Sequence, residues 1–428
     1  MAIRQMFESL GPLYIKVGQI LATRPDFVSE ETRHELSHLN DRAEVRPFEE
    51  FEPVLVDELG PDWRSHFSSI ETQQPLGAAS LAQVYRATLR DGSPCVIKVQ
   101  RPRAREAVQE DMRALRRVLR VTSRLVPGFN ELVDLPAMLD LLFDVMRDEL
   151  DFTREASNMK KARKAAKGYK RISVPKVLIA RPRVLVQTLA DGVAINKIKP
   201  DELTPKQRKK LGYELMNFML ECYLVGGWFH ADPHPGNILV DSRGKAHIID
   251  WGMVGAIDRS TQHAFLGILL GLASNDGEVA AAHWIGLGYP TSKAQIRGFA
   301  RDVSRVIPKW SYATLDELNY GVALLSVLKF STRRKIQTAP VISVLGKSLA
   351  NMEGSVRCIY PRLKLSKSIT GLLGRISQHL LATSMRPEII ATRAATALRA
   401  GEKSGLQVQA LLDDLSAGGL KLRARPFG

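Results

Sequence analysis

Apolar positions along the chain change their spacing near residue 66. Residues 1–65 carry apolar side chains at helical spacing, which predicts a helical segment. Beyond it, alternating apolar residues predict strands over Ala82–Leu89 and Cys95–Val99. The dipeptide Asp91-Gly92 between them favours a tight turn, so we expect these two strands to form a hairpin.

The next part of the chain alternates between long helices and short strands. Helical spacing covers Ala104–Leu125 and Leu135–Ala166, and Val174–Ala190 returns to strands. A further amphipathic helix follows, because Thr204 can cap it and Pro205 suits the first helical position.

Two short apolar runs, Ile238–Val240 and His247–Ile249, predict a second hairpin, and the chain from about residue 258 onward has helical spacing. Strands followed by helices around one short hairpin predict an α+β fold with two lobes. The expected domains are a helical extension over 1–65, an N-lobe with inserted helices over 66–190, a C-lobe over 191–350 and a helical region over 351–428.

Composition indicates a cytoplasmic protein. The 428 residues are 45% hydrophobic, yet the longest apolar run, Ala264–Ala273, is too short to span a bilayer. The first residues lack the order of charge, apolar run and small residues that marks a signal peptide. The 3 cysteines have no paired spacing, as expected in a reducing compartment.

A formal net charge of +16 leaves several interpretations of the surface open. The densest basic run, Lys160–Arg171, fits a solvated helical face, an anionic membrane surface or an acidic partner. It contains a single aromatic residue, Tyr169, so its composition does not favour nucleic acid as a partner. A basic amphipathic helix over Leu363–Leu381 fits either a membrane surface or packing onto the C-lobe.

The candidate chemistry centres on the segment from His230 to Asn237. It places Asp232 and Asn237 at the spacing of a kinase catalytic loop, in which the carboxylate orients the attacking hydroxyl and the amide oxygen binds magnesium. Thirteen residues after Asn237, the segment Asp250-Trp251-Gly252 follows a predicted strand. Asp250 is therefore expected to be the second magnesium ligand.

Upstream elements complete a nucleotide site. Lys98 ends the run Cys95-Val96-Ile97-Lys98 on a predicted strand, where it can pair with the α- and β-phosphates. Glu149 and Asp151 are the expected carboxylates near this lysine, with Glu149 as its catalytic partner. The small residues of a phosphate-covering loop are Gly77, Ala78, Ala79 and Ser80.

One segment imitates a different chemistry. His34 and His38 spell H-E-x-x-H, which on a helix would place both imidazoles on one face for zinc. No third histidine follows at the spacing that such proteases use, so we do not expect zinc catalysis.

These motifs together resemble the UbiB/AarF group of atypical kinases. Lys16-Val17-Gly18-Gln19 looks like the Lys-x-Gly-Gln signature of that group, and the alanine-rich loop, the Glu-x-Asp pair, the His-x-Asp-Pro-His-Pro-Gly-Asn loop and the metal aspartate follow in order. The resemblance covers roughly residues 8–260 and implies a protein-kinase-like fold. It also implies that the helix carrying Lys16 and Gln19 folds over the active site, with Glu149 or Asp151 as acidic partners.

The chain departs from the family pattern at specific places. Gly77 stands where the family usually has alanine, Trp251 replaces a phenylalanine, and Gln187-Thr188 replaces a Met-Glu pair at the adenine hinge. The contacts to adenine are therefore left unassigned.

The resemblance implies an atypical kinase or ATPase that uses ATP (or ADP) and Mg²⁺ and supports isoprenoid quinone or prenyl-lipid metabolism. The expected location is the cytoplasm, with peripheral contact to the inner face of the membrane and to proteins of a quinone or prenyl-lipid pathway. A small-molecule kinase of the aminoglycoside or choline type and a nucleotide-responsive scaffold are the alternatives.

Overall fold

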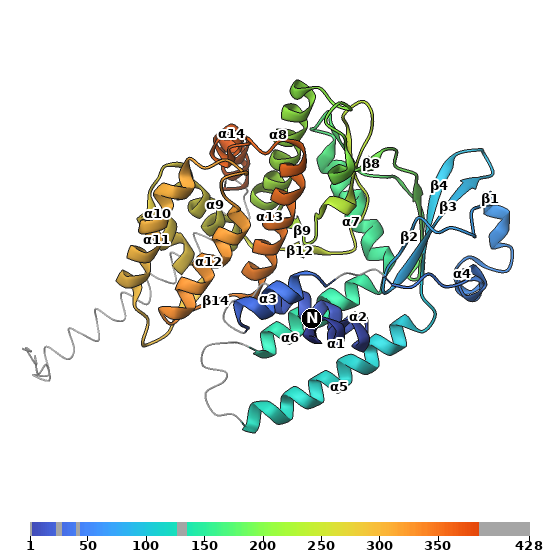
Figure 1. The fold of residues 1–428 in the computed structure, drawn as a ribbon, viewed down its shortest axis with the longest axis horizontal. Coiled ribbons are helices and arrows are strands. Elements are labelled where there is room, and N and C mark those ends of the chain that lie inside the picture. The colour runs from blue at the N-terminus through green and yellow to red at the C-terminus, as the bar shows by residue number, and fades with distance from the viewer. Residues whose placement is uncertain (1, 23–27, 40–42, 126–134, 385–428) are drawn as a thin grey trace, which may run out of the picture. The chain divides into compact units, whose positions relative to one another are not determined.

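The computed structural model describes residues 2–22, 28–39, 43–125 and 135–384 (Figure 1). Contacts divide the chain into two units, residues 1–372 and residues 373–428. The first unit holds every strand of the described chain and helices α1 to α13. Helix α14 spans Leu365–Ser384, and Ile369 and Leu372, in its part within the first unit, are buried.

The N-lobe is built on a 6-stranded antiparallel sheet. Its path is β1-β3-β4-β7-β6, and the short β2 pairs with β3. The strands are β1 (Phe67–Ile70), β2 (Gly77–Ala78), β3 (Ala82–Leu89), β4 (Pro94–Gln100), β6 (Val177–Ala180) and β7 (Val184–Thr188). The predicted hairpin of β3 and β4 is confirmed, and it turns at Asp91 and Gly92, where Gly92 has a φ of 81°.

The two faces of this sheet have different roles. Side chains of Tyr85, Ile97 and Val186 are buried on one face, where they pack with residues from helix α4 (Glu52–Leu59) and its flanks. Because side chains alternate along a strand, Lys98 lies on the opposite face from Ile97. The expected boundary at residue 65 falls within a 3-10 helix, Trp63–His66, and α4 before it belongs to the same core as the sheet.

The helices between β4 and β6 are α5 (Ala104–Leu125), α6 (Leu135–Glu149) and α7 (Phe152–Ala166). The prediction of one helical stretch over Leu135–Ala166 missed a break between α6 and α7. Asp151 makes this break, because its side chain accepts a hydrogen bond from the backbone N–H of Thr153 and so caps α7.

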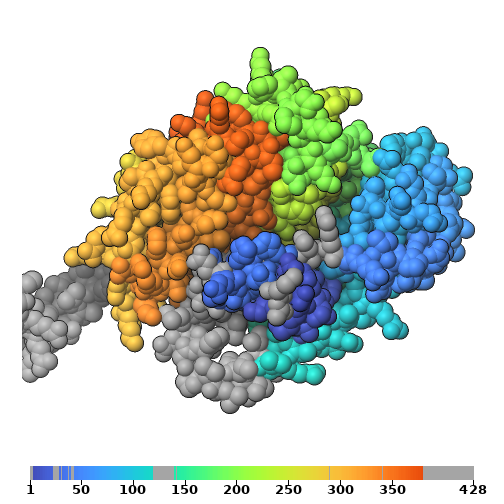
Figure 2. Space-filling model, viewed as in Figure 1, coloured from blue at the N-terminus to red at the C-terminus, as the bar shows by residue number. Residues whose placement is uncertain are grey.

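Three helices precede the N-lobe: α1 (Ala2–Leu10), α2 (Pro12–Ala22) and α3 (Glu30–Ser37). Leu13 of α2 is buried among residues of α5 and α6, so α2 packs against these helices. Figure 2 shows the N-terminal segment, in dark blue, on the surface beside the cyan α5.

The C-lobe begins with β8 (Val193–Ala194) and α8 (Pro205–Glu221). The predicted start of α8 at Thr204 and Pro205 is confirmed, because Thr204 forms a capping box with Gln207. Short strands follow: β9 (Trp228–His230), β10 (Ile238–Val240), β11 (Ala246–Ile248) and β12 (Val254–Ala256). β10 pairs with β11 as predicted, and β11 also pairs with β5 (Ile172–Ser173). The pairing of β9 with β12 joins the segments on either side of the candidate motifs.

The remaining elements of the first unit are mainly helical: α9 (Arg259–Ala273), α10 (Gly277–Ile285), α11 (Ile296–Ser311), α12 (Tyr320–Arg333) and α13 (Pro340–Ile359), with a small ladder of β13 (Gly288–Pro290) and β14 (Ile336–Thr338). The expected domain boundary at residue 350 falls inside α13.

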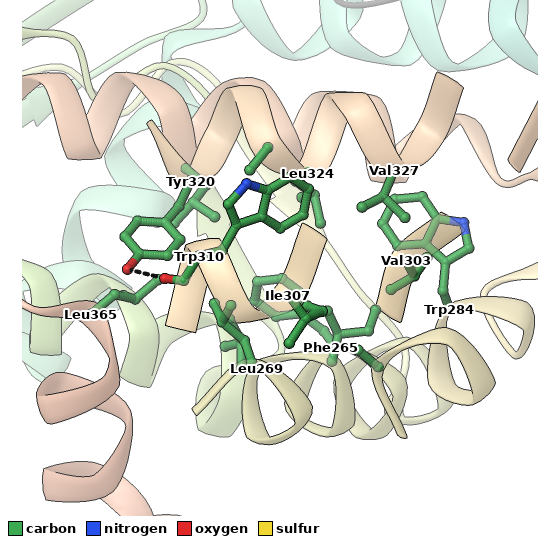
Figure 3. A pocket seen from close by; sticks show the side chains of 15 residues that line it. Phe265, Leu269, Trp284, Val303, Ile307, Trp310, Tyr320, Leu324, Val327 and Leu365 are labelled. Carbon is green, nitrogen blue, oxygen red and sulfur yellow. Dashed lines mark hydrogen bonds between the residues drawn. The ribbon is translucent and has the colours of Figure 1, made fainter. Parts of the chain in front are cut away.

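An apolar cavity of about 500 Å³, including its open mouth, lies among these helices. Figure 3 shows Trp310, Ile307 and Leu324 around it, with the Tyr320 hydroxyl donating to the carbonyl oxygen of Trp310 at 2.8 Å. Within the described residues, no helix is both long enough and apolar enough to cross a bilayer.

Candidate active site

The catalytic-type loop lies between β9 and β10 and is fixed from inside the protein. His230 is 1% exposed, and its Nδ1 accepts a hydrogen bond from the backbone N–H of Asp232 at 3.1 Å. Burial lowers the pKa of His230, although Asp250 and Asp232 act against it. The imidazole is therefore a neutral brace that sets the backbone at Asp232.

The same loop sets the distance between its two functional side chains. Asn237 donates from Nδ2 to the carbonyl oxygen of Asp232 at 3.3 Å. That bond uses the amide nitrogen and leaves the amide oxygen of Asn237 to serve as a metal ligand. Magnesium prefers oxygen ligands, so this donor is of the appropriate type.

Asp250 follows β11, and its position is set by its neighbours in the sequence. Its Oδ1 accepts the backbone N–H of Gly252 at 2.9 Å and lies 4.0 Å from Lys98 Nζ. Burial would raise the pKa of Asp250, but Lys98 and the Gly252 N–H outweigh burial and lower the pKa to about 2. Asp250 is thus an anionic carboxylate at neutral pH.

Trp251 anchors this segment in the core. Its side chain is 0% exposed, and its indole N–H donates to the carbonyl oxygen of Ile248 at 3.0 Å. The indole packs against the His230 ring at a centroid distance of 4.8 Å. The tryptophan at this position therefore ties the segment that carries Asp250 directly to the catalytic-type loop.

Lys98 has a different carboxylate partner from the one that the sequence predicted. Its Nζ lies 2.8 Å from Oε2 of Glu155, in the first turn of α7, and Glu155 is 2% exposed. Burial alone would lower the pKa of Lys98, but Asp250 and Glu155 outweigh burial and raise it, so the lysine remains a cation. The pairing of Lys98 with Glu149 or Asp151 is therefore corrected to Glu155.

The helix break at Asp151 is the physical reason for this correction. A continuous helix from residue 135 to 166 would have continued along the direction of α6, whereas the cap at Asp151 starts α7 anew and places Glu155 one turn inside it. Asp151 itself uses its carboxylate on Thr153. The sequence feature that could have identified Glu155 as the partner of Lys98 is its position four residues after Asp151, the aspartate that caps α7.

Glu149 pairs with the N-terminal helix instead. Lys16 Nζ of α2 lies 2.7 Å from Glu149 Oε1, and the two side chains are 7% and 13% exposed. Lys16 also donates to Met253 Sδ at 3.1 Å, three residues after Asp250. The expectation that Lys16 reaches an acidic partner at the active site agrees with this contact, with Glu149 and not Asp151 as that partner.

The glycine between Lys16 and Gln19 has a steric role. A Cβ on Gly18 would lie 2.3 Å from the Leu39 side chain, so a larger residue would push α2 away from its neighbour. Gln19 then donates to the carbonyl oxygen of Leu39 at 3.4 Å and accepts from Lys347 Nζ at 3.4 Å. Helix α2 is thus held by hydrogen bonds to Leu39 on one side and from Lys347 on the other.

These residues surround one cavity of about 620 Å³, including its open mouth. Its lining comes from both lobes and from α2: Lys16, Ala79, Ser80, Leu81, Ala82, Lys98, Glu149, Phe152, Glu155, His230, Asp232, His234, Asn237, Asp250, Gly252 and Met253. Of the expected phosphate-covering loop, Ala79 and Ser80 line it, whereas Gly77 and Ala78 form β2 and pair with β3.

The sequence did not predict any contact from α13. Asn351 Nδ2 donates to Asp232 Oδ1 at 2.5 Å, and Lys347 Nζ lies 3.6 Å from Asp232 Oδ2. Burial would raise the pKa of Asp232, but Lys347 and Lys16 help to lower it below its ordinary value. The Asn351–Asp232 contact joins positions 119 residues apart, which no local pattern reveals.

The H-E-x-x-H segment lies at the C-terminal end of α3. His34 and His38 have their ring centroids 4.7 Å apart, but no group of three or more His, Cys, Asp or Glu side chains among the described residues could hold a metal ion. A magnesium ion between nucleotide phosphates needs fewer protein ligands, and Asp250 and Asn237 supply the oxygen donors that it prefers.

Comparison with known proteins identifies a matching family and several relatives. The ABC1 atypical kinase-like domain matches residues 38–283. A "probable protein kinase UbiB" from Cellvibrio japonicus is 30% identical over 85% of this chain and 66% of its own length. An uncharacterised protein from the hydrogenase 1 5' region of Clostridium pasteurianum is 27% identical, over 85% of this chain and 68% of its own. The chain thus spans about two thirds of the length of these relatives.

A solved structure has the same fold. The Rv3197 protein of Mycobacterium tuberculosis, determined as an erythromycin complex, is 24% identical and covers 87% of this chain and 95% of its own, with a TM-score of 0.60. The predicted α+β, kinase-like fold is confirmed.

Proposed function

Because the chain belongs to the ABC1 atypical kinase-like family, we propose that it is a phosphotransferase or ATPase that uses ATP and Mg²⁺. The observation that carries the proposal is the convergence of Lys98, Asp232, Asn237 and Asp250 on a single cavity. Lys98 lies on β4, Asp232 and Asn237 lie on the loop between β9 and β10, and Asp250 follows β11.

The residues divide the work of phosphoryl transfer among them. Lys98, held by Glu155 at 2.8 Å, would contact the α- and β-phosphates. Asp250 and Asn237 would hold the magnesium ion, which neutralises charge on the phosphates. Asp232, with its backbone braced by His230, would orient the attacking oxygen and accept its proton.

Helix α2 bears on the choice of acceptor. Lys16 lines the same cavity as Asp232 and pairs with Glu149 there. A segment of the chain thus occupies space beside the catalytic carboxylate, where a kinase would receive its acceptor. This arrangement favours a small acceptor or water over a protein chain.

The physiological role in the proposal is support of isoprenoid quinone or prenyl-lipid metabolism. Its support is the similarity to relatives named UbiB. Metabolite and lipid profiles of a deletion strain would test it, with the strain complemented by wild-type protein or by Asp250→Asn. Accumulation of a quinone precursor that only the wild-type protein reverses is the expected result, and equal complementation by both proteins would refute a role for the site.

Purified protein tests the chemistry. Wild-type protein should release phosphate from Mg²⁺-ATP, and Asp232→Asn should keep nucleotide binding but lose roughly a hundredfold or more in turnover. Phosphate release by Asp232→Asn within about threefold of wild type would contradict the catalytic assignment. Nucleotide binding without any turnover by wild-type protein would favour the nucleotide-responsive scaffold.

The proposal includes contact with an anionic membrane surface. The net charge of +16 supports it, as do the exposed lysines Lys160 and Lys164 of α7 and Lys167 at its C-terminal cap. Each such residue near an anionic surface contributes about 1 kcal/mol. Co-sedimentation with anionic vesicles that salt weakens is expected, and equal recovery with neutral vesicles would refute it.

A further inference from the structure

Helix α13 presents a row of polar side chains to the catalytic-type loop. Lys347, Asn351 and Ser355 recur at intervals of four residues and therefore lie on one face of the helix. Figure 1 shows α13 alongside β9 and β12, the strands that frame the two motifs. This helix lies beyond residues 38–283, the part of the chain that the kinase-like domain matches.

Contacts from this face reach successive residues of the loop. Ser348 donates to the carbonyl oxygen of His230, and Ser355 donates to that of Pro233 at 2.8 Å. Ser348 also bonds to the hydroxyl of Tyr223 at 2.7 Å, and both of these side chains are buried. The backbone on either side of Asp232 is thereby fixed from outside the loop.

The carboxylate of Asp232 is fixed by the same face. Asn351 Nδ2 donates to Oδ1 at 2.5 Å, which sets the rotation of the carboxylate about its bond to Cβ. Oδ2 then remains for the attacking oxygen, with Lys347 Nζ 3.6 Å away. Lys347 also donates to Gln19 Oε1 at 3.4 Å, so one ammonium group touches both the catalytic carboxylate and helix α2.

We propose that Asn351 and Lys347 are positioning residues for phosphoryl transfer: Asn351 orients the Asp232 carboxylate, and Lys347 couples helix α2 to it. This inference rests on the proposed function. Neither residue is among those that line the nucleotide cavity, so both act through Asp232 and Gln19 and not through the nucleotide. Helix α13 is thus part of the catalytic apparatus and not an appendage of the kinase-like domain.

Steady-state kinetics test the role of Asn351. Asn351→Ala should lower kcat about tenfold or more while KM and the affinity for Mg²⁺-ADP stay within about twofold of wild type. In an Asp232→Asn background the same substitution should have no further effect on turnover, because residue 232 no longer has a carboxylate for Asn351 to orient for proton transfer. An unchanged kcat, or equal losses in both backgrounds, would overturn the proposal.

Lys347 has a matched set of variants. Lys347→Met should lower kcat, and Lys347→Arg should restore most of it because arginine keeps the charge. Lys329→Met on α12 removes an exposed lysine from the neighbouring helix and serves as the control, with activity expected to be unchanged. Equal activity of Lys347→Met and the control would refute the role of Lys347.

Hydrogen–deuterium exchange separates this inference from the proposed function. In Lys347→Met, amides of α2 should exchange several-fold faster than in wild type, whereas amides of β3 and β4 should not change. Unchanged exchange in α2 would overturn the coupling, whatever the activity. If wild-type protein releases no phosphate, the proposed function and the kinetic role fall together, and the exchange result alone decides whether α13 holds α2.

Discussion

Replacing Glu155 with glutamine removes the charge that holds Lys98 while keeping the volume of the side chain. Lys98 Nζ lies 2.8 Å from the Glu155 carboxylate, and the Asp250 carboxylate is 4.0 Å away, so the lysine has a second carboxylate within reach. After the substitution, Lys98 should shift towards Asp250 and compete with magnesium for that ligand.

The magnitude follows from the kind of bond that is lost. A hydrogen bond to a charged group contributes about 1.5–3 kcal/mol, and Glu155 is 2% exposed, so little water can replace the bond. Asp250 compensates part of the lost charge and keeps the cost below the 3–5 kcal/mol typical of breaking a buried ion pair. We expect Glu155→Gln to lower the free energy of unfolding by about 2 kcal/mol and to weaken Mg²⁺-dependent nucleotide binding about tenfold.

Glu149→Gln is the matched control. Its carboxylate pairs with Lys16 at 2.7 Å and is also well shielded, so its loss should cost similar stability. Because Lys98 keeps Glu155 in this variant, Mg²⁺-nucleotide affinity should remain within about twofold of wild type. Urea unfolding and calorimetric titration with Mg²⁺-ADP measure the two quantities. A larger loss of affinity in Glu149→Gln than in Glu155→Gln would refute the assignment of Glu155.

Three further predictions concern single contacts. Asp250→Asn should abolish the thermal shift caused by Mg²⁺-ATP, since the metal loses its carboxylate; a shift of wild-type size would remove Asp250 from the site. The effects of charge reversals at Lys16 and Glu149 on the free energy of unfolding should be non-additive by about 0.5–3 kcal/mol. The effects of reversals at Lys16 and Asp151 should be additive, because Asp151 caps α7 and does not pair with Lys16. The opposite pattern would make Asp151 the partner of Lys16. Burial raises the pKa of Glu353 from 4.5 to about 7, so the native state binds a proton that the unfolded state lacks, and stability should fall as pH rises through that window. Glu353→Gln should flatten this slope in urea unfolding at pH 5 and pH 8, and an unchanged slope would contradict the origin of the effect.

Local patterns in the sequence were sufficient wherever the determining contacts are local. The β3–β4 hairpin follows from strand periodicity and the Asp91-Gly92 turn, and alternation along β4 places Lys98 opposite Ile97. The spacing of Asp232 and Asn237 likewise reflects a loop that closes on itself through the Asn237 side chain.

Local patterns did not predict contacts that depend on where a helix begins or on segments far apart in the sequence. The partner of Lys98 depends on the cap at Asp151, because a break of two residues decides whether Glu149 or Glu155 faces the sheet. Asn351 reaches Asp232 only because α13 packs against the loop from the far end of the domain. The helix cap at Asp151 set the first outcome, and tertiary packing of α13 set the second.

The burial of Trp251 restricts the binding modes that are open to inhibitors of this protein. In protein kinases, the packing of the aromatic residue after the metal aspartate separates active from inactive states. Here the indole is 0% exposed and bonded to the carbonyl oxygen of Ile248, so vacating its pocket would leave a large void. Such voids cost about 3–5 kcal/mol, which corresponds to at least a hundredfold in affinity. A compound that binds by displacing this side chain would carry that penalty, whereas one that competes with nucleotide in the existing cavity would not.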